Sequence, residues 1–330
     1  MHNNIILDKS DVKSVLEKYP SMIREAISLG KDVSIPGGIK NIFITGMGGS
    51  AFPGDLLKCA IKELNIPIFV NKGYNLPKHA DSQSLVFAVS YSGNTEETIS
   101  SYRDALRKKA IVVAISSGGK LEELSIINKN IHIKVPGGFQ PRLSTPYLFV
   151  PMVNVLFKAG LIKDYSIVLE TTINVLNNGQ AAEKARNIAS RLKGKIPLIY
   201  SSDEFFAVAE KWKCDINENS KVPAFYNVFP EFNHNEICSY LNPIGNFFVI
   251  FIKDESDSDR VKKRFAIVKR LITKRGIDVI ELSLSGEHVL TRILTGIYIG
   301  LWVSYYLALE YHQDPTPVAI IEELKKELEK

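Results

Sequence analysis

Short apolar runs alternate with amphipathic stretches along the first half of the chain. The runs that predict strands lie at residues 41–46, 67–70, 84–90, 110–115 and 131–133. Apolar residues at helical spacing predict helices over 10–29, 50–64 and 95–108. Continuous apolar strands that alternate with helices are typical of a parallel sheet covered on both faces. Prolines at 141, 146 and 151 are expected to interrupt the chain before an apolar helix that ends at Ala159.

The second half repeats this order of elements in its pattern, though not in residue identity. Strands are predicted at 197–200, 246–252 and 278–282, with a helix over 259–274 between the last two. They match the first, third and fourth strands of the first half. We therefore predict an α/β fold of two αβα sandwich domains, each with a mainly parallel, doubly wound sheet. The junction is expected around residues 160–180, and helices are expected at both ends of the chain.

Residues 293–309 carry no charge and approach the lower length limit of a membrane span. The stretch contains glycine, serine, threonine and three tyrosines, and no second stretch of this kind occurs. Helices that are apolar all round are typical of the centre of larger proteins. The pattern favours a buried core or interface helix, and no membrane partner is expected.

Net charge and cysteine content narrow the possible partners and the compartment of the protein. The net charge is +5, with basic and acidic residues mixed throughout, and no basic stretch carries interleaved aromatics. Nucleic acid is therefore disfavoured as a partner. The three widely spaced cysteines disfavour a disulfide framework or a thiolate metal site. Together with an N-terminus that lacks signal-peptide features, they predict a cytoplasmic protein.

Two turns of the first half have the composition of anion sites. Residues 46–50 read Gly-Met-Gly-Gly-Ser and residues 90–95 read Ser-Tyr-Ser-Gly-Asn-Thr, each between a predicted strand and helix. In a parallel sheet both turns fall on the carboxyl edge, where backbone N–H groups and hydroxyls can bind a phosphate. The alternative is an ordinary helix capped by serine or threonine. Neither turn is a P-loop, which disfavours a nucleotide.

The corresponding turn of the second half is acidic, whereas the two turns of the first half are uncharged. Residues 253–259 read Lys-Asp-Glu-Ser-Asp-Ser-Asp. Its acids would repel a phosphate, so a single phosphate site in the first half is the simpler prediction.

Acid–base candidates lie outside these turns. Glu218 follows a predicted helix and His234 lies in a polar loop. A carboxylate and an imidazole can both move protons near neutral pH, although a solvated charge is the alternative for Glu218. His234 and Glu236 lack a third ligand at a suitable spacing, so no metal is expected. Arg142 follows a Gly- and Pro-rich segment and is either aimed at an anion or a surface-loop residue.

These residues resemble a known family. The turns at 46–50 and 90–95 are similar to the sugar-phosphate-binding turns of the sugar isomerase (SIS) domain. The whole chain resembles the bifunctional phosphoglucose/phosphomannose isomerases. Further similar segments are Gln-Pro-Arg at 140–142, Ile-Asn-Glu-Asn at 216–219, Asn-His-Asn-Glu at 233–236 and the tail from Asp314 to Lys325.

The resemblance implies an aldose–ketose isomerase that interconverts glucose 6-phosphate and mannose 6-phosphate with fructose 6-phosphate. The reaction would pass through an enediolate, without metal or cofactor, in a homodimer. Alternatives are a non-catalytic sugar-phosphate-binding SIS protein or another SIS-domain enzyme. The implied domains are an N-terminal helical segment (1–36), a phosphate-binding SIS domain (37–160), a second SIS domain (161–311) and a C-terminal tail that completes the active site (312–330).

The resemblance also implies the role of each site residue. Glu218 moves the proton between C1 and C2, and Arg142 stabilises the enediolate. His234 assists ring opening from the partner subunit, and Lys325, preferred to Lys326, helps at the ring oxygen. The substrate, chiefly its phosphate, is held by Ser50, Ser90, Ser92, Thr95 and the backbone of Gly48 and Gly49.

Overall fold

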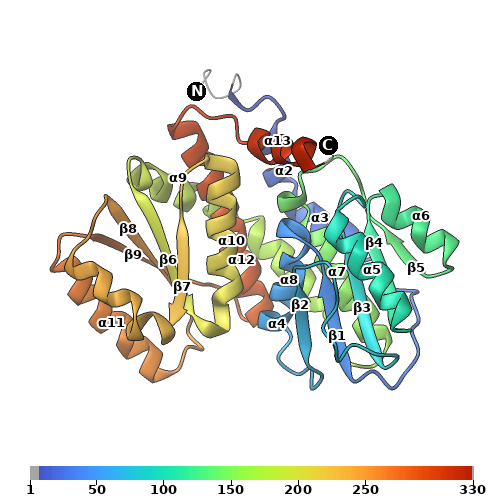
Figure 1. Cartoon of the computed structure of the whole chain (residues 1–330). Helices are drawn as coiled ribbons and strands as arrows, with labels where there is room; N and C mark the ends of the chain where they lie inside the picture. The colour runs from blue at the N-terminus through green and yellow to red at the C-terminus, as the bar shows by residue number, and fades with distance from the viewer. Residues whose placement is uncertain (1–6, 329–330) are drawn as a thin grey trace. The chain divides into compact units, whose positions relative to one another are not determined.

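The computed structural model describes residues 7–328 and divides them into two compact units. We call residues 18–177 with 288–291 the first domain. The remainder, residues 7–17, 178–287 and 292–328, is called the second domain. Figure 1 shows that each domain is built around its own sheet, with helices packed on it.

The first domain contains a five-stranded parallel sheet of order β2-β1-β3-β4-β5. Its strands are β1 (Asn41–Thr45), β2 (Ile68–Asn71), β3 (Ser84–Val89), β4 (Ile111–Ser116) and β5 (Ile131–Lys134). Every residue of β3 is buried, as expected for a central strand covered on both faces. The predicted α/β class is confirmed, and the carboxyl ends of the strands meet at one edge.

Helices cover this sheet through the side chains that alternate along its strands. They are α3 (Tyr19–Ala26), α4 (Phe52–Ala60), α5 (Glu96–Arg107), α6 (Gly119–Ile127), α7 (Thr145–Lys158) and α8 (Ser166–Leu176). Tyr102 of α5 and Leu121 of α6 pack with Phe43, Val86 and Val112 of the sheet. On another side, α3 packs against α7 and α8. Burial of these apolar faces supplies the main driving force for folding of the domain.

Two expectations about helices were wrong. The stretch at 10–29 forms two helices, α2 (Val12–Glu17) and α3, and Pro20 occupies the first turn of α3, where a missing N–H costs little. Pro151 does not interrupt the chain, because it lies inside α7. Its neighbours on α7 are almost fully buried, and we attribute the continuous helix to this packing, which opposes the cost of about 3 kcal/mol for an interior proline.

The second domain contains a four-stranded parallel sheet of order β7-β6-β8-β9. Its strands are β6 (Ile196–Ser202), β7 (Phe225–Phe229), β8 (Phe247–Lys253) and β9 (Asp278–Ser283). This order repeats β2-β1-β3-β4 of the first domain strand for strand. The weak repeat in the sequence therefore reflects a shared topology.

The helices of the second domain are α2, α9 (Gln180–Leu192), α10 (Phe206–Asp215), α11 (Asp259–Thr273), most of α12 (Val289–Glu310) and α13 (Ala319–Leu328). In Figure 1, α10 lies along β6 and β7. Within residues 7–328, one helix, α12, is long and apolar enough to cross a membrane. However, 83% of its most apolar stretch is buried in the protein. A hydrogen bond of 2.8 Å from Trp212 Nε1 to the Gly296 carbonyl joins it to α10. These are features of a core helix, as the sequence predicted.

Candidate active site

The first glycine-rich turn leads from β1 into α4. Gly48–Ser50 forms a 3-10 turn directly before the helix. Ser50 is buried, and its hydroxyl accepts a hydrogen bond of 3.0 Å from the Tyr91 N–H. The two predicted turns are therefore held together at the carboxyl edge of the first sheet.

The second turn leads from β3 into α5. The Ser90 hydroxyl donates to Thr95 Oγ1 at 2.9 Å, and the Asn94 N–H donates to Ser92 Oγ at 3.3 Å. Gly93 has a φ of +74°, and a Cβ there would lie 1.7 Å from the Gly118 carbonyl oxygen. Only glycine fits this position, so the turn has one fixed shape.

Simple capping does not account for the hydroxyls of these turns. Thr95 is the N-cap of α5, yet its side chain makes no capping hydrogen bond. The N-cap of α4 is Ala51, whose methyl group cannot cap a helix. The Thr95 hydroxyl is instead engaged with Ser90. N–H groups at a helix start that lack a side-chain cap are the donors that bind phosphates in other proteins.

Arg142 lies beside the first turn. It belongs to a 3-10 turn, Pro141–Leu143, and is only 3% exposed, so the surface-loop alternative is wrong. A Cβ on Gly49 would lie 2.9 Å from the Arg142 backbone nitrogen, which shows how closely the turn at 141–143 packs on the first glycine-rich turn. A buried arginine beside a candidate anion site is suited to offset negative charge.

Tyr91 is a positioning residue that the sequence did not reveal. Its hydroxyl donates to the Pro136 carbonyl at 2.8 Å and accepts from the Phe139 N–H at 3.0 Å. Burial raises the pKa of the Tyr91 hydroxyl, so it stays a donor at neutral pH. It thus connects the second turn to the segment that leads to Arg142. The available signal was an aromatic residue inside an otherwise small and polar turn.

Glu218 lies in the second domain on a π-helical turn, Ile216–Ser220, that continues α10. Asn219 Nδ2 donates to Ser304 Oγ at 2.9 Å, and Ser220 Oγ donates to the Ser304 carbonyl at 2.7 Å. Both bonds fix the turn on α12. Glu218 itself is half-buried. Single π-turns occur frequently at functional sites.

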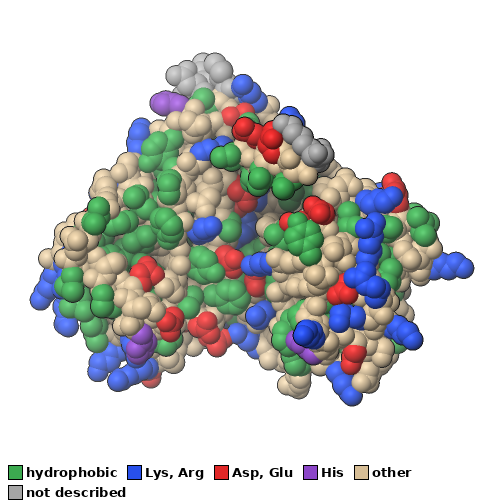
Figure 2. Space-filling model, viewed as in Figure 1, with side chains coloured by type: hydrophobic (Ala, Val, Ile, Leu, Met, Phe, Trp, Pro, Cys, Tyr) green, Lys and Arg blue, Asp and Glu red, His purple; other side chains and the backbone are tan. Residues whose placement is uncertain are grey.

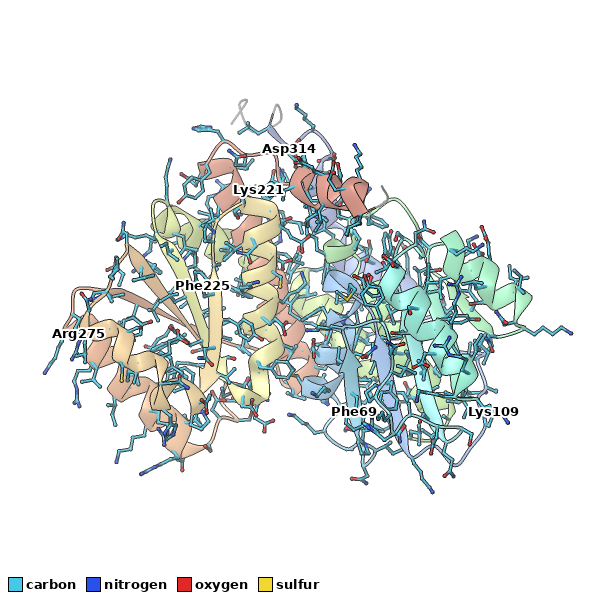
Figure 3. All side chains as sticks on the ribbon, in the orientation of Figure 1. Phe69, Lys109, Lys221, Phe225, Arg275 and Asp314 are labelled. Atoms are coloured by element: carbon cyan, nitrogen blue, oxygen red, sulfur yellow. The ribbon has the colours of Figure 1, made fainter. Side chains whose placement is uncertain are left out.

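Lys221 connects this turn to the C-terminal tail. It has a left-handed φ of 58°, and its ammonium group donates to the carbonyls of Glu218 at 2.9 Å and Asn219 at 3.1 Å. A third bond of 2.8 Å reaches the Asp314 carbonyl, and Figure 3 labels both residues of this pair. A cation here also complements the negative helix end. The signal for this role in the sequence is weak, since it is only a lysine just past the helix.

His234 ends a 3-10 turn, Glu231–His234, and is exposed in the single chain. Its neighbour Asn233 accepts a hydrogen bond of 3.1 Å from Arg264 of α11. Lys325 and Lys326 both lie exposed on α13, so the geometry does not choose between them. Among residues 7–328, no three His, Cys, Asp or Glu side chains are grouped to hold a metal ion.

Arg292 pairs with two of the four acidic side chains in the acidic turn of the second domain. Arg292 Nε donates to Asp254 Oδ2 at 2.8 Å, and Nη1 donates to Glu255 Oε1 at 3.1 Å. Ser258 caps α11 by accepting from the Val261 N–H. The Arg292 guanidinium is thereby engaged within the domain and is not available to a bound anion, and a phosphate site in the first domain only stays a prediction.

The predicted site residues fall into two groups. The first domain brings together its two turns and Arg142, which include Gly48, Gly49, Ser50, Ser90, Ser92 and Thr95. The second domain carries Glu218, His234 and Lys325. Figure 2 shows basic and acidic side chains distributed over the visible surface of both domains.

Comparisons with known proteins define the class. Residues 38–136 match the family model described as SIS domain, and residues 181–328 match the bacterial phospho-glucose isomerase C-terminal SIS domain. The fold is similar to the C-terminal domain of glucosamine-fructose-6-phosphate aminotransferase from Francisella tularensis. That similarity has a TM-score of 0.71 at 16% identity and covers 91% of this chain and 96% of that one. Fold and models together define a protein of two SIS domains.

Sequence relatives define the family. A bifunctional phosphoglucose/phosphomannose isomerase from Caldicellulosiruptor bescii is 40% identical over 326 residues, which covers 94% of this chain and 96% of the relative. A D-glucosamine-6-phosphate 4-epimerase from Sulfolobus acidocaldarius is 34% identical over 244 residues, covering 72% and 76%. The chain belongs to the family of bifunctional phosphoglucose/phosphomannose isomerases.

Proposed function

We propose that this chain is an aldose–ketose isomerase that interconverts glucose 6-phosphate and mannose 6-phosphate with fructose 6-phosphate. The observation that carries the proposal is the joining of a glycine-rich turn to a hydroxyl-rich turn, with buried Arg142 packed beside the first, in a chain of this family. A hexose phosphate suits such a site, because its phosphate needs N–H and hydroxyl donors and its reacting carbons need a nearby cation.

In this proposal the first domain binds the phosphate. Backbone N–H groups of Gly48 and Gly49 and the hydroxyls of Ser50, Ser92 and Thr95 act as donors, and the buried Ser90 supports the site by donating its hydroxyl to Thr95. The start of α5 adds partial positive charge, although Glu96 and Glu97 lie in its first turn and offset part of it. The hydroxyl donors are therefore expected to carry a larger share of phosphate binding than the helix dipole.

Glu218 is proposed as the base that moves the proton between C1 and C2. Removing a proton beside a carbonyl places negative charge on oxygen, and the Arg142 guanidinium offsets that charge without a metal or cofactor. Glucose and mannose 6-phosphates differ at C2 and share one enediolate. Return of the proton to either face of C2 therefore gives both aldoses from one intermediate.

The remaining roles extend the proposal to a homodimer. His234 assists ring opening from the partner subunit, which is supported by its exposure in the single chain. Lys325 acts at the ring oxygen from the tail at 312–330, which completes the site. We assign phosphate binding to the SIS domain at 37–160, with the second SIS domain at 161–311 and the N-terminal helical segment at 1–36. The protein is proposed to act in the cytoplasm.

One assay tests this function against its alternatives. EDTA-treated protein is incubated with fructose 6-phosphate, and both glucose 6-phosphate and mannose 6-phosphate are measured over time. We expect both aldoses to form at rates that added divalent cations do not change. Binding without turnover would identify a sugar-phosphate sensor instead. Conversion of glucosamine 6-phosphate but not fructose 6-phosphate would indicate the epimerase activity for which one relative is named.

A further inference from the structure

We propose that Glu236 is a positioning residue that fixes the turn on which His234 is displayed. The inference rests on the proposed function for the role of His234, but the contacts that support it belong to the second domain alone. Glu236 follows His234 by two positions, and no role in catalysis or binding has been given to it so far.

The Glu236 carboxylate bridges two paired strands. Tyr200 of β6 donates its hydroxyl to Oε1 at 2.5 Å, and Asn227 of β7 donates Nδ2 to Oε2 at 2.6 Å. Tyr200 and Asn227 are direct neighbours in the register of the sheet. Both carboxylate oxygens are thus engaged by side chains of two paired strands, so Glu236 is not poised as a metal ligand with His234.

The two donors are oriented for a carboxylate. Asn227 Oδ1 accepts from the Val228 N–H at 2.7 Å, which turns the amide NH2 toward Glu236. Burial raises the pKa of the Tyr200 hydroxyl, so this group remains protonated and able to donate. Short hydrogen bonds to a charged acceptor are about twice as strong as neutral ones. A neutral amide at position 236 has only one acceptor oxygen, so either Tyr200 or Asn227 would face an NH2 group instead.

The rest of the turn is held in the same way, while the imidazole is exposed. Phe232 is fully buried, and the centroid of its ring lies 4.4 Å from the centroid of the Tyr200 ring. Asn233 is bonded to Arg264, and the Glu236 N–H is capped by Asn235 Oδ1 at 2.5 Å. His234 is therefore an exposed side chain on a backbone fixed on both sides. Such preorganisation is useful for a group that acts outside its own domain.

A kinetic double-mutant cycle tests the proposal. Displacement of a catalytic group by about 1 Å can cost roughly 100-fold, so Glu236→Gln is expected to lower kcat by about 10- to 100-fold with little change in KM. In a His234→Ala background the same substitution is expected to cost nothing further, because its effect passes through His234. Equal losses in both backgrounds would overturn the proposal.

A rescue variant and a control sharpen the result. Adding Asn227→Asp to Glu236→Gln reverses donor and acceptor in one bond and is expected to recover most of kcat. Glu281→Gln removes a carboxylate from β9 of the same domain and is expected to leave kcat unchanged. Should Glu236→Gln not fold, Tyr200→Phe removes one of the two bonds and keeps the ring; a smaller loss of kcat is expected, again absent in the His234→Ala background.

A measurement without turnover separates this inference from the proposed function. Hydrogen exchange followed by mass spectrometry is expected to show faster exchange in Glu236→Gln over residues 230–241, with β6 and β8 unchanged. Unchanged exchange over that segment would overturn the positioning role even if the isomerase activity is established. Absence of isomerase activity with faster exchange would contradict the proposed function and leave the structural role supported.

Discussion

The hydroxyl of Ser50 joins the two turns of the first domain, and hydroxyls also hold the second turn together. Ser50 accepts from the backbone of the second turn, and Ser90 and Thr95 bond to each other. Each hydroxyl has one proton to donate, so Ser50 and Thr95, which only accept in these bonds, can still donate to a bound phosphate, whereas Ser90 already donates to Thr95. Glu218 and His234 lie on separate turns of the second domain, each held by hydrogen bonds of the neighbouring residues.

Glu218→Gln is expected to abolish turnover while binding is retained. The amide keeps the size of the side chain and loses the base, which is worth about 10²–10⁴-fold. The measurements are kcat and the dissociation constant for fructose 6-phosphate from calorimetry. Glu204→Gln, elsewhere in the second domain, serves as the control. A Glu218→Gln variant with normal kcat would refute the assignment of the base.

Asp257 makes stability depend on pH in the second domain. Burial raises the pKa of its carboxyl above the ordinary 3.8, although the Ser202 hydroxyl and the Asp254 N–H partly oppose this shift. Protonation therefore favours the folded state. The stabilisation is complete below pH 4 and is lost as pH rises through the raised pKa. Asp257→Asn is expected to raise the melting temperature at pH 7 more than at pH 4, and an equal shift at both values would contradict this.

At the level of elements, the strand-to-helix turns depend on close backbone contacts. Gly93→Ala would place a methyl group on the Gly118 carbonyl, so the second turn must open. We expect a strong rise in KM for the sugar phosphate and a lower melting temperature. Gly73→Ala is the matched control, because a Cβ there meets no atom within 4 Å. Equal behaviour of the two variants would show that the shape of the second turn is not required.

The elements were predictable where a local pattern determines them. The apolar runs at 84–90 and 246–252 became the central strands β3 and β8, since burial on both faces leaves a continuous apolar signal. Pro151 misled the prediction, because tertiary packing overrides the local cost of a proline inside α7. The strand β7 was missed, since it lies at an edge and its residues 225–226 are exposed.

The site was predictable in its residue types and less so in its geometry. The turn compositions predicted candidate phosphate donors, and the resemblance supplied Glu218 and His234 as candidate acid–base groups. The burial of Arg142, the π-turn under Glu218 and the bonds of Lys221 depend on contacts between distant parts of the chain. No local pattern encodes such contacts.

At the level of the whole molecule, the proposed site combines residues from two subunits. Purified Glu218→Gln and His234→Ala proteins are each expected to have little activity. When the two are unfolded together and refolded, mixed dimers form in which one site contains both wild-type residues. We expect up to about a quarter of wild-type activity, since half of the dimers are mixed and half of their sites are intact. No recovery in verified mixed dimers would contradict the shared site.

The central claim is that the first-domain turns hold a hexose phosphate where Glu218 can reach its second carbon. A crystal structure with a bound sugar acid phosphate, a planar mimic of the enediolate, tests this most directly. The phosphate is expected on Ser50 and Thr95, with a Glu218 oxygen within about 3.5 Å of the reacting carbons. A phosphate bound elsewhere, or a Glu218 carboxylate facing solvent in every subunit, would contradict the account.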